Sequence, residues 1–114
     1  MGAGSLFLRN RRQQGAAATL TKTASATLTA AEVIGYDIIS AGHASSPVDL
    51  DLPAANAGLA GVVILIGNNG AQTLTVGGNF GAGSELDVTL PLGAGCLVWC
   101  DGTNWYALNA TVAA

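Results

Sequence analysis

The single histidine of this 114-residue chain lies close to the hydroxyls and the carboxylate that a hydrolytic enzyme would use. His43 is followed by Ser45, Ser46 and Asp49, and Ser40 precedes it. A serine nucleophile also needs a sharp turn such as Gly-x-Ser-x-Gly and an oxyanion site. The sequence has no such motif, so we interpret His43 as a loop residue between two strands. We expect no catalytic residue and no enzymatic activity.

Two pairs of alternating acidic residues could offer carboxylates to a divalent cation from one face of a sheet. The pairs are Asp49 with Asp51 and Glu85 with Asp87. We favour a solvated outer face that resists edge-to-edge aggregation. The glycine-rich segment 77–83 lacks the lysine and hydroxyl residue of a phosphate-binding loop, so we interpret it as an inter-strand loop. We therefore expect no cofactor and no metal.

The remaining chemically distinctive side chains are three aromatic residues near the C-terminus and two cysteines. Trp99, Trp105 and Tyr106 could stack on sugars, but we favour buried anchors of a β fold. Cys96 and Cys100 lie four residues apart in a predicted strand, which places their Cα atoms about 13 Å apart. That distance is too long for a disulfide, so we expect reduced core thiols.

Charged residues make up only 10% of the chain, and the two signs are separated along it. All four basic residues lie within the first 22 positions, all seven acidic residues follow, and the net charge is -3. Such a body disfavours nucleic acid as a partner. So few charges indicate that much of the surface contacts other protein. The longest apolar stretch, 59–66, is too short for a membrane span, and no signal peptide is visible.

Residues 1–17 show no period that would bury a face, so we expect an extended N-terminal arm, followed by a single β domain at 18–114. Hydroxyl residues alternate with small apolar ones over 19–29, which predicts one extended strand. Thr29 and Glu32 then have the spacing of a capping box, and Gly35 ends the short helix that this box begins.

The rest of the chain reads as short strands separated by turn residues, at 36–40, 48–52, 61–66, 73–76, 85–90, 96–100 and 104–108. This pattern predicts an all-β fold, an antiparallel β-sandwich or jelly-roll-like barrel of about 7–8 strands. Asn68-Asn69-Gly70 and Asp101-Gly102 have the composition of hairpin turns. Segments 62–66 and 97–99 are apolar on both faces, so both faces need a cover that so small a chain cannot easily supply.

Two segments are candidate binding elements. The arm carries a short apolar and basic clip suited to an acidic, grooved partner surface; its residues are Leu6, Phe7, Leu8, Arg9, Arg11 and Arg12. The hydroxyl face of the predicted first strand offers an edge for strand addition to a neighbour; its residues are Thr19, Thr21, Thr23, Ser25 and Thr27.

The order of several short segments resembles that of small β domains in tailed-bacteriophage virion proteins. The segments are 28–35, 48–53, 63–68, 72–78 and 101–108. Such domains occur as capsid decoration (cement) proteins and as knobs on tail fibres, usually as homotrimers. The chain has no shaft, coiled coil or repeat before the domain, which suits a cement protein better than a fibre.

The resemblance implies a structural role. We expect a homotrimer made in the host cytoplasm that binds the major capsid protein on the outside of the phage head and stabilises the shell, with its arm and β body as the contacts. The alternative is a tail or head fibre knob that binds a host receptor or glycan. Neither role involves a membrane.

Overall fold

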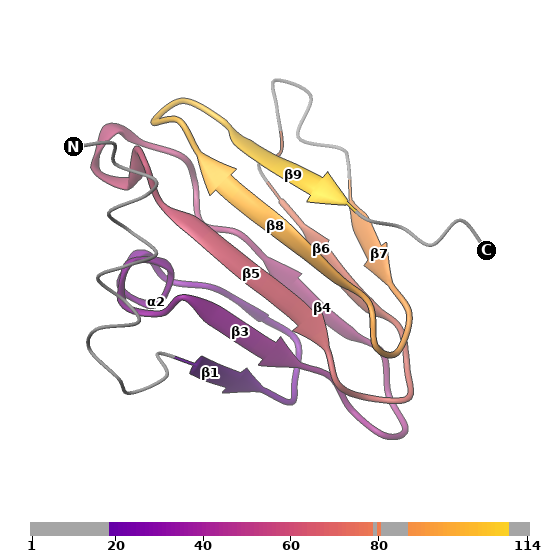
Figure 1. Cartoon of the computed structure of the whole chain (residues 1–114). Coiled ribbons are helices and arrows are strands. Elements are labelled where there is room, and N and C mark those ends of the chain that lie inside the picture. The colour runs from indigo at the N-terminus through magenta and orange to yellow at the C-terminus, as the bar shows by residue number, and fades with distance from the viewer. Residues whose placement is uncertain (1–18, 79, 81–86, 110–114) are drawn as a thin grey trace.

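The computed structural model describes residues 19–78, 80 and 87–109, and these form two β-sheets packed face to face (Figure 1). The predicted all-β fold with short strands and one short helix is confirmed. The five-stranded sheet has the order β1 (Thr19–Lys22), β3 (Ile38–Ala41), β5 (Val63–Asn68), β8 (Gly95–Cys100), β9 (Trp105–Asn109). The four-stranded sheet has the order β2 (Ala26–Thr27), β4 (Val48–Asp51), β6 (Leu74–Gly77), β7 (Val88–Leu90).

The sheets are mixed, whereas the sequence predicted antiparallel pairing throughout. β1, β3 and β5 run parallel, as do β2, β4 and β6, and only the pairs formed by β7, β8 and β9 are antiparallel. The reason is the order of the strands. From β1 to β6 the chain changes sheet after every strand, so each return to a sheet is in the same direction. Of the two predicted architectures, two separate sheets correspond to the sandwich.

The predicted strand at 19–29 is divided between the two sheets. β1 ends at Lys22, the chain bends around Ala24, and β2 begins at Ala26 in the other layer. The Ser25 hydroxyl accepts a hydrogen bond from the Asp49 amide at 2.9 Å, which fixes the crossing. The period of two continues through the bend because both halves are extended, and therefore the pattern did not reveal the break.

A short helix, α2 (Ala30–Gly35), connects β2 to β3, and the predicted capping box is confirmed. The Thr29 hydroxyl accepts from the Glu32 amide at 3.1 Å, and the Glu32 carboxylate accepts from the Thr29 amide at 3.0 Å. Lys22 pairs with the same carboxylate at 2.7 Å. These donors hold the pKa of Glu32 below its ordinary value, the Lys22 hydrogen bond contributing most.

Alternate residues of both sheets point between the layers and form one continuous core. The inward positions include Ile39, Ala41, Ile64, Ile66, Cys96, Val98, Cys100 and Trp105 from the larger sheet, and Val48, Leu50, Leu74, Val76, Val88 and Leu90 from the smaller. Trp105 is fully buried, and its Nε1 donates to the Pro53 carbonyl at 2.7 Å. A 3-10 turn at Ala57–Leu59 adds the buried Leu59.

The hairpin predicted at Asn68-Asn69-Gly70 is wrong, because β5 and β6 belong to different sheets. The chain crosses between the layers at this point, and Asn68 is buried in the crossing. Its Nδ2 donates to the carbonyls of Leu90 and Gln72, both at 2.8 Å, while its Oδ1 accepts from the Gly70 amide at 2.9 Å. One side chain thus ties β5 to the strand β7 of the opposite sheet.

The second predicted turn, Asp101-Gly102, does connect the hairpin of β8 and β9. Gly102 has a φ of +96°, in the region that favours glycine. The Asp101 carboxylate accepts from the amides of Thr103 and Asn104, both at 2.8 Å, which closes the turn. Among the described residues, no helix is long and apolar enough to cross a bilayer.

Candidate functional site

The outer face of the five-stranded sheet carries an apolar row that crosses four neighbouring strands. The strand register aligns Ile38 with Leu65, Leu65 with Leu97, and Leu97 with Leu108, and Thr19 continues the row on β1. Leu65 is 48% exposed and Leu108 is 62% exposed. The sequence predicted that these strands need a cover on both faces. Within the described part of one chain, the outer face has none.

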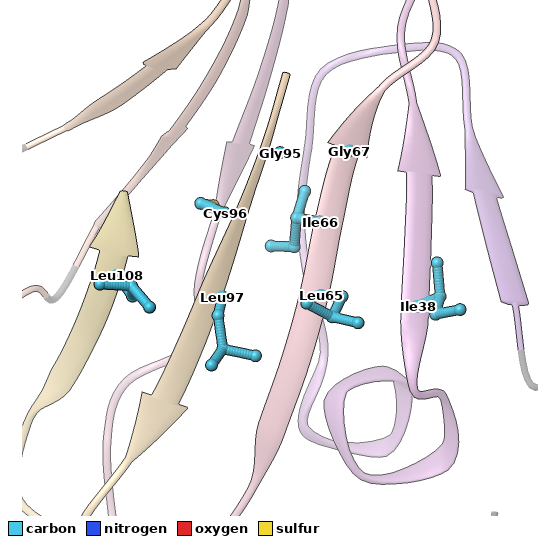
Figure 2. A pocket seen from close by; sticks show the side chains of 8 residues that line it. All are labelled: Ile38, Leu65, Ile66, Gly67, Gly95, Cys96, Leu97 and Leu108. Atoms are coloured by element: carbon cyan, nitrogen blue, oxygen red, sulfur yellow. The ribbon is translucent and has the colours of Figure 1, made fainter. Parts of the chain in front are cut away.

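A hollow lies beside this row, where two glycines face each other across β5 and β8 (Figure 2). Gly67 pairs with Gly95, so the next outward position on both strands has no side chain. The hollow measures about 380 Å³ and is lined by Ile38, Leu65, Ile66, Gly67, Gly95, Cys96, Leu97 and Leu108. Its walls are the apolar side chains of the row, and its lining contains no charged residue. It therefore suits an apolar group better than a polar one.

On the other side of the row, the outer face carries an aromatic pair. Trp99 and Tyr106 face each other across β8 and β9, with ring centroids 5.8 Å apart and planes inclined by 24°. Tyr106 is 37% exposed and Trp99 is half-buried on the same outer face, so the expectation of buried anchors is wrong for Tyr106, holds in part for Trp99 and holds fully for Trp105. The alternation of the strand explains the difference, because Trp105 and Tyr106 are neighbours and point to opposite faces.

The Asp101 carboxylate lies beside the aromatic pair, at one end of this face. The Tyr106 hydroxyl donates to Oδ2 of Asp101 at 3.0 Å. The amides of Asn104 and Thr103, which donate to the other oxygen, lower the pKa of Asp101, and the Tyr106 hydroxyl adds to the effect. Asp101 is therefore a fully ionised group beside the aromatic pair at neutral pH.

The outer face of the four-stranded sheet is polar, as predicted for its strands. Asp49 and Asp51 in β4 are exposed, while Val48 and Leu50, with which they alternate, are buried. Gly77 lies between Asp51 and Asp87, and a β carbon at that glycine would clash with the Asp87 carboxylate and contact that of Asp51. Among residues 19–78, 80 and 87–109, no group of three or more His, Cys, Asp or Glu side chains could hold a metal ion. Glu85 lies outside the described residues.

The nucleophilic and basic side chains occupy structural positions. His43 is exposed in a loop, as predicted, and its Nδ1 lies 3.0 Å and 3.2 Å from the amides of Ser45 and Ser46. The imidazole thus closes a local turn. Cys96 and Cys100 are buried and free, as predicted. Burial raises the pKa of the Cys96 thiol to about 11, which leaves it unreactive at neutral pH.

The residues of the predicted strand-addition edge are divided between the two sheets. Thr19 and Thr21 are exposed on β1, which is an edge strand of the larger sheet, and Thr27 is exposed on β2, an edge strand of the smaller. Thr23 and Ser25 lie in the crossing between them. The structure therefore does not bring the five residues onto one edge. The predicted arm, with its clip at 6–12, lies outside the described residues.

The glycine hollow is the feature that sequence reasoning missed. The doubly apolar pattern of 62–66 and 97–99 identified the uncovered face correctly. It did not identify the hollow, because the pairing of Gly67 with Gly95 depends on the register of β5 and β8. These two strands are neighbours in the sheet but far apart in the sequence, with β6 and β7 between them. An isolated glycine at the end of each strand was the available signal.

No family model matches the chain, and no curated protein matches it. The chain is similar to a solved structure described as the crystal structure of enterohemorrhagic E. coli StcE(132-251). The two share 17% sequence identity with a TM-score of 0.52, over 84% of this chain and 94% of that chain. At this identity the similarity shows a common β fold and nothing about activity or partners.

Proposed function

We propose that this chain is a structural virion protein of a tailed bacteriophage, a homotrimeric decoration protein that binds the outside of the head and stabilises the shell. The observation that carries the proposal is the uncovered apolar row of Ile38, Leu65, Leu97 and Leu108 on an otherwise compact body. An exposed apolar face of this kind marks a protein interface. The order of the strand and turn segments, which resembles that of small phage virion domains, supplies the virion setting.

The size of the face decides what kind of interface it supports. Four strands about 4.8 Å apart, with about three outward positions along each strand and about 7 Å between them, give a face on the order of 400 Å². Covering it contributes on the order of 10 kcal/mol at about 25 cal/mol/Å². Association costs roughly 4–15 kcal/mol, so the face alone gives only marginal binding. A closed ring of three copies makes this contact three times, which stabilises the assembly beyond a single contact.

The acidic outer face of the smaller sheet supports the same arrangement. Asp49, Asp51 and Asp87 are exposed and keep that face solvated, which discourages a further copy from packing on it. A trimer whose apolar faces are shared among copies presents these acidic faces outward. That orientation suits a protein on the outer surface of a shell.

Binding to purified heads tests this function. The chain is mixed with undecorated heads of the phage whose genome encodes it, and the pellet is analysed after sedimentation of the heads. We expect saturable binding in multiples of three copies and heads that withstand a higher temperature before they release DNA. A chain that stays in the supernatant, with unchanged head stability, overturns the proposal.

One observation favours the alternative of a fibre knob that binds a host glycan. The half-buried Trp99 and the exposed Tyr106 form a stacked pair beside the ionised Asp101, and aromatic rings with a nearby carboxylate are suited to binding a sugar. A glycan array separates the two functions. Hits that Trp99→Ala abolishes would support the knob, and an array without hits would count against it.

A further inference from the structure

We propose that residues 6–12 of each copy bind the outer face of the five-stranded sheet of an adjacent copy, with Phe7 in the hollow above Gly67 and Gly95. This inference rests on the proposed homotrimer and names the contact that holds it together. The arm was predicted to suit an acidic, grooved surface; this face supplies the groove as an apolar hollow and a carboxylate, Asp101, at its end.

The hollow fits one bulky apolar side chain. A β carbon built on Gly67 meets only the Ala94 carbonyl, at 4.0 Å, so the space above this glycine is open. Paired glycines within a sheet are typical of a place where another chain approaches closely. Phe7 is the only aromatic residue that precedes β1, and the hollow is bordered by the apolar Leu65 and Leu97 side chains.

The arm is long enough to reach an adjacent copy. It joins the body at Thr19, on the edge strand of the same sheet, one strand away from Ile38. The eleven steps from Leu8 to Thr19 span up to about 38 Å when extended. The sheet is only about 19 Å wide from β1 to β9. The length therefore allows the arm to leave its own edge and cross the face of a neighbour.

The charges of the arm and the body are complementary. Arg9, Arg11 and Arg12 are the only cations of the sequence besides Lys22, and Lys22 is paired with Glu32. On the larger sheet, the ionised Asp101 lies at the end of the apolar face beside Tyr106. An arginine that follows the apolar residues of the clip can reach such a carboxylate.

Exchange of arms between copies supplies the interface area that the sheet face alone lacks. The face is too small to hold two bodies together by direct contact, whereas an arm adds its own apolar area and charge pairs to each interface. The same contact repeated around a threefold axis closes a ring in which every face is covered and every arm is bound.

Disulfide trapping in the full-length chain tests the exchange. Ser5→Cys, which leaves Phe7 and the rest of 6–12 unchanged, is combined with Leu65→Cys, and the matched control combines Ser5→Cys with Thr89→Cys, an exposed position on the outer face of the other sheet. After mild oxidation we expect covalent species of two and three copies on a non-reducing gel for the first pair. A bridge within one copy, or no more bridging than in the control, overturns the proposal.

A second variant blocks the hollow without removing the arm. Gly67 has open space at the position of a β carbon and valine suits a strand, so we expect Gly67→Val to retain the fold, which circular dichroism checks. We expect at least a tenfold loss of bridging between Ser5→Cys and Leu65→Cys, while Thr75→Val on the other sheet leaves bridging unchanged. Undiminished bridging in Gly67→Val contradicts the placement of Phe7. If the unmodified chain is trimeric but the first pair does not bridge, only the arm exchange fails; a monomeric unmodified chain refutes the trimer of the proposed function.

Discussion

The two sheets have equivalent inner faces and opposite outer faces. Both contribute fully buried residues to the core, such as Ile64 from β5 and Leu74 from β6. On the outside, the larger sheet presents Leu65 and Leu108, whereas the smaller presents Asp49 and Asp51. A sandwich needs only one buried side per sheet for its stability. The described residues leave the apolar outer face uncovered, and we propose that it contacts other protein, while the polar face stays in water.

The largest expected effect tests the equivalence of the inner faces. Ile64→Ala and Leu74→Ala should each lower the free energy of unfolding by about 2–5 kcal/mol, because each leaves a cavity in the shared core. Urea denaturation measures both. A loss below 1 kcal/mol for either variant would mean that its sheet contributes little to the core.

The next effect concerns the polar connection between the sheets. Asn68→Ala removes the bonds to Leu90, Gln72 and Gly70 and leaves buried backbone groups without partners, at a cost of about 2–4 kcal/mol. The adjacent Asn69 donates to the Ser40 hydroxyl at an exposed site, so Asn69→Ala should cost less than 1 kcal/mol. Equal losses in thermal or urea denaturation would contradict the role of Asn68.

Introducing a charge on one outer face or the other compares the roles of the two faces in self-association. Leu65→Arg should weaken self-association about 30-fold or more, the effect of losing a central contact of an interface worth about 2 kcal/mol. Thr89→Arg on the other sheet should change it less than threefold. Sedimentation equilibrium gives both dissociation constants. Equal effects of the two substitutions would show that the apolar face is not the interface.

The smallest effect lies at the helix that links the two sheets. The pKa of Glu32 is lowered in the folded chain, so its stabilisation is present above the ordinary pKa of 4.5 and is lost as the pH falls through the lower folded value. Glu32→Gln should therefore cost about 0.5–1 kcal/mol at pH 7 and almost nothing at pH 2. Denaturation curves at the two pH values measure it, and a pH-independent cost would contradict this origin.

Local patterns predicted local structure well. The capping box of Thr29 and Glu32, the alternation of Val48 and Leu50 with acidic residues, and the turn at Asp101 all rest on neighbours within a few positions. Each of these features was confirmed because its physical cause lies within the same segment.

Features that depend on distant pairing were missed. The break near Ala24, the parallel pairing of β1, β3 and β5 and the burial of Asn68 follow from which sheet each segment joins. Periodicity reports the alternation of a strand but not its layer. For the same reason the sequence revealed an uncovered apolar face but not the hollow at Gly67.

The molar mass of the unmodified, full-length chain in solution tests the central claim most directly. Light scattering at tens of micromolar should give three times the mass of one chain, because the apolar face of each copy is covered by another. A mass of one chain at that concentration, with a folded circular dichroism spectrum, would show that the face stays uncovered in water and would contradict the account.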